Sequence, residues 1–247
     1  MEHPHDQLLG GKYRLGSLIS SGGMGRVYRA TDVRLGTEIA IKMLAPHSEE
    51  DPRREARFLR EARAVSELHH PNIVEVLDFG VDGGEPYLVM ELLAGETLRA
   101  RLEREGRLDL AETGRLLAAL ARGVGCAHRA GVAHCDLKPE NVFLVGGDAQ
   151  VKLLDFGQAR PAAEASLLST ASRSPMGTPA YMSPEQATGG DVGPASDLWS
   201  LGVIAYECLV GRRPFEGETI GELILQICSW PLPVPSRHAL VPGAIDA

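Results

Sequence analysis

Cysteine is scarce in this sequence, and the few cysteines form no recognisable pattern. The 247 residues contain four of them, namely Cys126, Cys135, Cys208 and Cys228. No two have the C-x-x-C spacing of metal-binding or redox sites, and their positions suggest no disulfide framework. The sequence therefore argues against a structural zinc site and a disulfide-rich secreted fold, and it predicts a reducing compartment.

Long apolar runs and an excess of positive charge are also lacking. The longest apolar stretch, residues 198–210, has 13 residues and contains Glu207, whereas a membrane-spanning helix needs about 20. No charged and apolar leader follows Met1. The formal net charge is −8, which argues against a nucleic-acid partner. We therefore expect a cytoplasmic protein without a membrane segment, whose partners are proteins or nucleotides; the oligomeric state stays open.

The first part of the chain has the pattern of a small β-sheet with one helix. Its length allows one large domain or two lobes. An N-cap at Asp51 and a proline at position 52 predict a helix with one apolar stripe, formed by Leu59, Ala62, Val65 and Leu68. Around this helix, alternating apolar residues predict strands over residues 15–19, 27–30, 38–44, 73–80 and 87–90.

After Gly95 the pattern becomes helical. A capping box of Asp109 and Glu112 opens a helix that Gly131 ends, with a stripe of Leu116, Leu120, Val124 and Ala127. A second helix is predicted over residues 196–211, with Leu198, Leu201, Ile204, Ala205 and Leu209 buried. The proline-rich stretch 231–242 is expected to be irregular. Two lobes joined near residues 91–95 are therefore predicted.

The most informative residues form the run from His134 to Asn141, which Asp155, Phe156 and Gly157 follow. Asp136 and Asn141 must lie on a loop, because Pro139 interrupts any helix there. An aspartate can accept the proton of a hydroxyl group, and oxygen atoms of Asn141 and Asp155 can hold a divalent cation against phosphate oxygens. These residues indicate phosphoryl transfer.

In these motifs, and from about Gly11 to its C-terminus, the chain resembles the bacterial Hanks-type (eukaryotic-like) serine/threonine protein kinases. The resemblance implies a two-lobed α+β fold with an antiparallel N-terminal sheet lobe and a mainly helical C-terminal lobe. Its parts would be a tail (1–12), an N-lobe (13–90), a hinge (91–95) and a C-lobe (96–247). It also implies transfer of the γ-phosphoryl group of ATP to serine or threonine hydroxyls of proteins, with autophosphorylation.

The resemblance implies a nucleotide site built mainly from the N-lobe. Lys42 would contact the phosphates and pair with Glu61, with Glu55 as the alternative carboxylate. The glycine-rich stretch 19–27 would cover the phosphates, although alone it could be an ordinary tight turn. Ser20 replaces the family's first glycine, which would cost about 1 kcal/mol if a positive φ is needed there. The implied nucleotide contacts are Ile19, Gly22, Gly25, Val27, Ala40, Lys42, Met90, Glu91, Leu93 and Phe143.

The same resemblance gives roles to the catalytic residues. Asp136 would orient the hydroxyl, and Lys138 would neutralise the transferring phosphoryl group. Asn141 and Asp155 would hold Mg2+, with Mn2+ as an alternative ion. His134 is expected to pack and to bond the backbone near Asp155 rather than to act as a base. The brace for the catalytic-loop backbone would be Asp197.

Two departures from the family pattern stand out. Cys135 occupies the position of an arginine that binds an activation-segment phosphate, so activation by phosphorylation is expected to be weak or absent. Relatives continue with further helices after the equivalent of Ala247, including an arginine that pairs with the residue matching Glu185. We therefore expect a fragment, a shortened gene product or a lobe that another protein completes.

The activation segment, residues 155–185, bears on substrate and regulation. Thr178 matches the family threonine that supports a serine or threonine substrate, and Thr170 and Ser172 are the expected autophosphorylation sites. The length of the segment, which ends at Glu185, argues against the alternative of a small-molecule phosphotransferase. The other alternative, favoured by Ser20 and the expected lack of the last helices, is a truncated or inactive kinase-like module that binds nucleotide or partner proteins.

Overall fold

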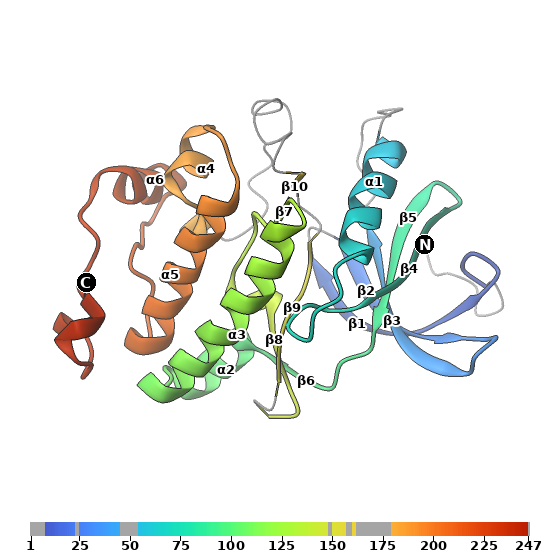
Figure 1. Cartoon of the computed structure of the whole chain (residues 1–247), viewed down its shortest axis with the longest axis horizontal. Coiled ribbons are helices and arrows are strands. Elements are labelled where there is room, and N and C mark those ends of the chain that lie inside the picture. The colour runs from blue at the N-terminus through green and yellow to red at the C-terminus, as the bar shows by residue number, and fades with distance from the viewer. Residues whose placement is uncertain are drawn as a thin grey trace. The chain divides into compact units, whose positions relative to one another are not determined.

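The computed structural model describes residues 8–22, 25–44, 54–147, 150–156, 160–161 and 179–246. The chain divides into two compact units, Met1–His70 with Val74–Ala94 and Pro71–Ile73 with Gly95–Ala247. Figure 1 labels the helices and strands of both units. Each unit has its own sheet and helices, so each is described separately.

Unit 1 contains a five-stranded antiparallel sheet in the order β1-β2-β3-β5-β4. This confirms the predicted antiparallel sheet. The β4–β5 turn consists of Gly83 and Gly84, both at positive φ, as the favoured two-residue hairpin turns require. The strands are β1 (Tyr13–Gly22), β2 (Gly25–Asp32), β3 (Thr37–Leu44), β4 (Val76–Asp82) and β5 (Glu85–Glu91).

One face of this sheet carries the core of unit 1. Ile39, Ile41 and Met43 alternate along β3 and are buried with Tyr13, Ala30, Tyr87 and Val89. The strand period of two therefore sends Ala40 and Lys42 to the opposite face. The helix α1 (Arg54–Ser66) contacts β4 and β5, and its predicted stripe is buried at Ala62 and Val65. The predicted helix start at positions 51 and 52 lies outside the described residues.

Unit 2 is mainly helical. It also holds a three-stranded sheet in the order β6-β8-β9 and the short pair β7–β10. Figure 1 shows α3 and α5 as its two long helices, and these two contact each other. The helices are α2 (Leu98–Glu105), α3 (Leu110–Arg129), α4 (Pro184–Thr188), α5 (Pro194–Val210) and α6 (Ile220–Ser229). The strands are β6 (Gly95–Thr97), β7 (Val132–Ala133), β8 (Val142–Val145), β9 (Gln150–Leu153) and β10 (Arg160–Pro161). Short 3-10 turns are η1 (Pro139–Asn141), η2 (Pro179–Tyr181), η3 (Pro235–Arg237) and η4 (Gly243–Asp246).

The two helices predicted in unit 2 both form, but two of the residues predicted to be buried in α5 are not, since Ala205 is half-buried and Leu198 is exposed. The α3 stripe is buried as predicted, and Asp109 caps the helix by accepting a hydrogen bond of 2.7 Å from the Glu112 backbone N–H. In α5, Leu201 and Ile204 are buried, but Leu198 is 63% exposed. The inward face of that turn is instead occupied by buried polar residues, including Asp197, which bond to neighbouring segments. Within the described ranges, no helix combines the length and apolar character needed to cross a bilayer.

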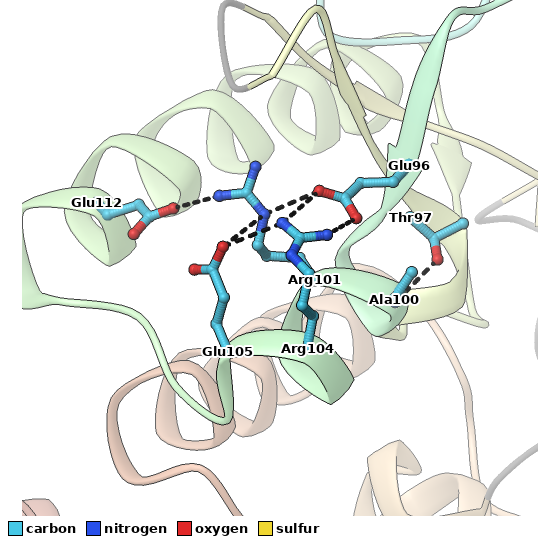
Figure 2. Close-up of polar contacts among 7 residues, drawn as sticks. All are labelled: Glu96, Thr97, Ala100, Arg101, Arg104, Glu105 and Glu112. Carbon is cyan, nitrogen blue, oxygen red and sulfur yellow. Dashed lines mark hydrogen bonds and ion pairs between the residues drawn. The ribbon is translucent and has the colours of Figure 1, made fainter.

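A charged network fixes α2 to the rest of unit 2 (Figure 2). Arg101, whose side chain is 10% exposed, donates to Glu96 of β6 at 2.9 Å and to Glu112 of α3 at 3.3 Å. Arg104 also donates to Glu96. Hydrogen bonds from Arg104 and Arg101 lower the pKa of Glu96 to about 2. The network therefore ties one helix to a strand and to a second helix.

Candidate active site

Three of the predicted catalytic side chains converge in unit 2, in the segment between β7 and β8. The Lys138 ammonium donates to Asp136 Oδ2 at 2.7 Å. The Asn141 amide nitrogen donates to the same oxygen at 3.1 Å and to the Asp136 backbone carbonyl at 2.8 Å. Asp136 is thus held from the side by two residues of its own loop. Both side-chain contacts use Oδ2, so among the described residues Asp136 Oδ1 is the carboxylate oxygen that a hydroxyl group could approach.

The environment of Asp136 alters its proton affinity. Burial raises the pKa of Asp136 above its ordinary value, while the hydrogen bond and charge of Lys138 act in the opposite direction. The negative charge of Asp155 raises it further. A carboxylate with a raised pKa is a stronger base than an exposed aspartate, which suits the acceptance of a hydroxyl proton.

Asp155 and Asn141 belong to adjoining stretches of backbone. The Leu154 backbone N–H donates to the Asn141 carbonyl at 2.8 Å, which places Asp155 one residue beyond this contact. Asp155 itself has φ 58°. Both hydrogen bonds described for the Asn141 side chain use its nitrogen, so its amide oxygen can coordinate a cation. One amide oxygen and one carboxylate match the few protein ligands that Mg2+ takes when phosphates supply others.

His134 supports this stretch of backbone as predicted. Its Nε2 lies 2.8 Å from the Leu154 carbonyl oxygen, next to Asp155. Its ring packs against Phe156 with the ring centroids 4.6 Å apart. The side chain is buried, so the expected packing of His134 and its contact with the backbone near Asp155 are confirmed.

Asp197 of α5 braces the loop, as predicted. Its carboxylate accepts hydrogen bonds from the backbone N–H groups of His134 at 2.9 Å and of Cys135 at 2.8 Å. His128 Nε2 lies 2.7 Å from the same carboxylate. Cys135 has φ 62°, a left-handed conformation that is costly for a residue with a Cβ. The Asp197 side chain, only 1% exposed, therefore holds a strained residue directly before Asp136.

A second polar cluster, which the sequence analysis missed, centres on Arg99 of α2. Its guanidinium donates to Glu140 at 2.9 Å, to Glu207 of α5 at 3.0 Å and to the Tyr181 hydroxyl of η2. Tyr181 in turn donates to Glu207. Glu140 lies between Pro139 and Asn141, so Arg99 contacts the catalytic loop itself. Glu207 was the available signal, because a charge in an apolar helix needs a buried partner.

Four of the predicted nucleotide contacts share one face of the sheet in unit 1. The strand register places Val27 opposite Lys42 and Ala40 opposite Met90. Ala40 and Lys42 point away from the core face, and directly opposed residues of neighbouring strands share a face. Lys42 is nevertheless only 7% exposed. Glu61 is half-buried on α1; its ion pair with Lys42 stays a prediction.

The backbone of β1 shows that Ser20, in place of a glycine, does not strain the glycine-rich stretch. Gly22 and Gly25 pair at the end of the β1–β2 ladder, and a Cβ on Gly25, which has φ 135°, would lie 2.1 Å from the Met43 carbonyl oxygen. Ser20 pairs with Val27 and does not have a positive φ. The expected penalty of about 1 kcal/mol for replacing glycine at this position therefore does not arise. Ile19 is half-exposed at an irregularity of the same strand.

The remaining predicted nucleotide contacts lie at the end of β5 and in β8. Glu91 closes β5 and is fixed by Glu75, whose backbone N–H donates to the Glu91 side chain at 2.8 Å and whose carbonyl accepts from the Glu91 N–H at 3.1 Å. Leu93 is half-buried two residues later, and Phe143 of β8 is half-buried in unit 2.

Of the predicted activation segment, residues 155–156, 160–161 and 179–185 are described. Glu185, whose arginine partner was expected to be missing, accepts a hydrogen bond of 2.6 Å from the Ser196 hydroxyl. Burial acts to raise the pKa of Glu185, but this hydrogen bond helps to lower it below its ordinary value. The described structure therefore gives Glu185 a neutral partner. Gly157, Thr170, Ser172 and Thr178 lie outside the described residues.

Comparisons with known proteins agree with this geometry. The family model "Protein kinase domain" matches residues 13–232. The chain is 45% identical over 215 residues to serine/threonine-protein kinase PknA of Mycobacterium tuberculosis, which covers 85% of the chain and 49% of that relative. It is 41% identical over 236 residues to serine/threonine-protein kinase PknL of the same organism, which covers 96% of the chain and 58% of that relative. The chain thus spans about half the length of the curated relatives it matches. It belongs to the protein kinase domain family, in the group of bacterial Hanks-type serine/threonine kinases.

Proposed function

We propose that this chain is a serine/threonine protein kinase domain that transfers the γ-phosphoryl group of ATP to serine or threonine hydroxyls of proteins. The observation that carries the proposal is the Asp136 carboxylate, which Lys138 and Asn141 contact within 2.7 to 3.1 Å. Asp197 braces the backbone on the other side of Asp136. The names of the relatives support a serine or threonine substrate, and autophosphorylation is part of the proposal.

The roles of the loop residues follow from their atoms. Asp136 orients the substrate hydroxyl and accepts its proton, which its raised pKa favours. Lys138, held at Asp136, supplies positive charge for the phosphoryl group in transit. Asn141 and Asp155 would hold Mg2+, or Mn2+ as an alternative, through oxygen atoms. The bound ion would neutralise charge on the phosphate oxygens.

For the nucleotide, the proposal uses the non-core face of the sheet in unit 1. Lys42 would contact the phosphates while Glu61 holds its ammonium, and Gly22 and Gly25 would let the β1–β2 turn approach the phosphates. Val27, Ala40, Met90 and Phe143 would form the apolar surroundings of the adenine, with Ile19 at the edge. Glu91 and Leu93 would offer backbone hydrogen bonds to the purine. This use of ATP, together with four free cysteines, supports a cytoplasmic location.

The test compares the purified chain with Asp136→Asn and with Asp191→Asn, which changes an exposed acid of the same unit. Each protein is incubated with γ-labelled ATP, Mg2+ and a basic protein substrate, and phosphoamino acids are identified after hydrolysis. Label on serine or threonine with the wild type and Asp191→Asn, and its loss with Asp136→Asn, is the expected result. Nucleotide binding without any transfer by the folded wild type would overturn the proposal and favour a regulatory module.

A further inference from the structure

A cavity of about 350 Å³ lies in unit 2 beside α3 and the strands β8 and β9. Its apolar wall includes Leu116 of α3, Leu144 of β8 and Val151 of β9, and Arg115 and Arg122 of α3 also line it. None of its lining residues belongs to the candidate active site. The volume reaches the range of natural ligand pockets, which begins at about 300 Å³. The cavity can therefore receive an apolar side chain beside two cationic groups.

The arginines of α3 extend this feature along the helix. Arg115, Arg122 and Arg129 are seven residues apart, so they share one face of α3, and all three are exposed. None of them makes an ion pair with a residue that the structure describes. Glu112, the acidic residue that lines the cavity, pairs with Arg101 instead. This face is thus a local concentration of uncompensated positive charge on a chain of net charge −8.

The length of the arginine row distinguishes between kinds of ligand. Arg129 lies 14 positions after Arg115, which corresponds to about 21 Å of helix at 1.5 Å per residue. A small anion would contact one arginine or two, whereas an extended peptide covers about 21 Å with six or seven residues. A nucleic acid duplex carries one negative charge per about 1.7 Å of its axis, so the net negative charge of the chain opposes it more strongly than it opposes a short peptide. A short acidic peptide fits the face best.

We propose that this face of α3 is a docking site for an extended acidic segment of a partner protein. An apolar side chain of that segment enters the cavity between Leu116, Leu144 and Val151. Its carboxylates lie along Arg115, Arg122 and Arg129. The site is separate from the residues that carry the proposed phosphoryl transfer, so the inference does not depend on that activity.

The probe is a fluorescein-labelled peptide of two leucines followed by six acidic residues, titrated with the 247-residue chain while anisotropy is measured. We expect saturable binding that weakens with added salt. The double variant Arg115→Glu/Arg122→Glu should weaken binding by about tenfold or more, because two attractions become repulsions. Ala118→Trp should also weaken it, since Ala118 is exposed and lines the cavity. Arg34→Glu, a single charge reversal in the exposed β2–β3 turn of unit 1, should leave it unchanged.

Several outcomes would overturn the proposal. These are no saturable binding of the acidic peptide, equal binding of a peptide with lysines in place of the acids, or undiminished binding by the double variant. Tight binding of a single-stranded oligonucleotide in place of the peptide would also overturn it. Thermal unfolding checks the fold of each variant. If the charge reversals unfold the chain, Arg115→Gln/Arg122→Gln replaces them, with a loss of about threefold or more expected.

Discussion

Replacing Asp197 with asparagine removes the charge that organises the catalytic loop while keeping the shape of the side chain. The carboxylate accepts from the backbone N–H groups of His134 and Cys135, and His128 Nε2 is its third neighbour. An asparagine has one acceptor oxygen, so its amide nitrogen must face at least one of these donors. Losing one hydrogen bond to a buried charge and leaving a donor unsatisfied costs about 3 kcal/mol. That is a large part of a typical stability of about 5–15 kcal/mol.

Urea unfolding followed by circular dichroism measures this loss. Asp191→Asn is the matched control, because Asp191 is exposed and the chemical change is the same. The control should stay within about 0.5 kcal/mol of the wild type. A loss for Asp197→Asn below about 1 kcal/mol, or one equal to that of the control, would refute the argument that Asp197 holds the loop by charged hydrogen bonds.

Three further predictions concern the polar networks. Arg99→Ala should lower kcat for a protein substrate by about tenfold and leave KM for ATP nearly unchanged, because Arg99 positions the catalytic loop. Steady-state kinetics measures both constants, with Arg104→Ala as the control. A change in KM alone would contradict the prediction. Lys138→Met should move the acidic limb of the kcat/KM profile to higher pH, because Lys138 lowers the pKa of Asp136; a limb that stays in place or moves down would count against it. The folded-state pKa of Glu96 is about 2, below the ordinary 4.5, so its contribution to stability is present above pH 4.5 and is lost as the pH falls toward 2. The difference in Tm between wild type and Glu96→Gln should therefore shrink with acidification, and a constant difference would disprove the linkage.

Local patterns predicted the elements whose cause is local. The alternation along β3 and the apolar stripe of α3 arise from the strand and helix periods, and both are buried as expected. The contacts of His134 and Asp197 were also expected, because the family resemblance implied them. The short strands β6, β8 and β9 were not predicted, since each has only three or four residues and depends on pairing with a distant segment.

Other residues could not be placed because their partners are distant in sequence. Arg99 bonds to Glu207, which lies 108 positions along the chain, and no helix pattern indicates such a contact. The expectation that Leu198 is buried was wrong. The helical period identifies the buried face only where that face is apolar, and here buried polar residues such as Asp197 occupy it. The doubt about Ser20 rested on a backbone angle, which only the structure supplies.

One helix, α5, provides contacts to three separate segments from a single side. Asp197 holds the loop before Asp136, Ser200 donates to the Tyr181 carbonyl at 2.8 Å, and Glu207 binds both Arg99 and Tyr181. Because these three side chains belong to one helix, a rigid-body displacement of α5 moves all three contacts together and preserves the distances between them. Repacking around this helix can therefore translate the loop and its neighbours as a set, whereas a bend within the helix would change their relative positions.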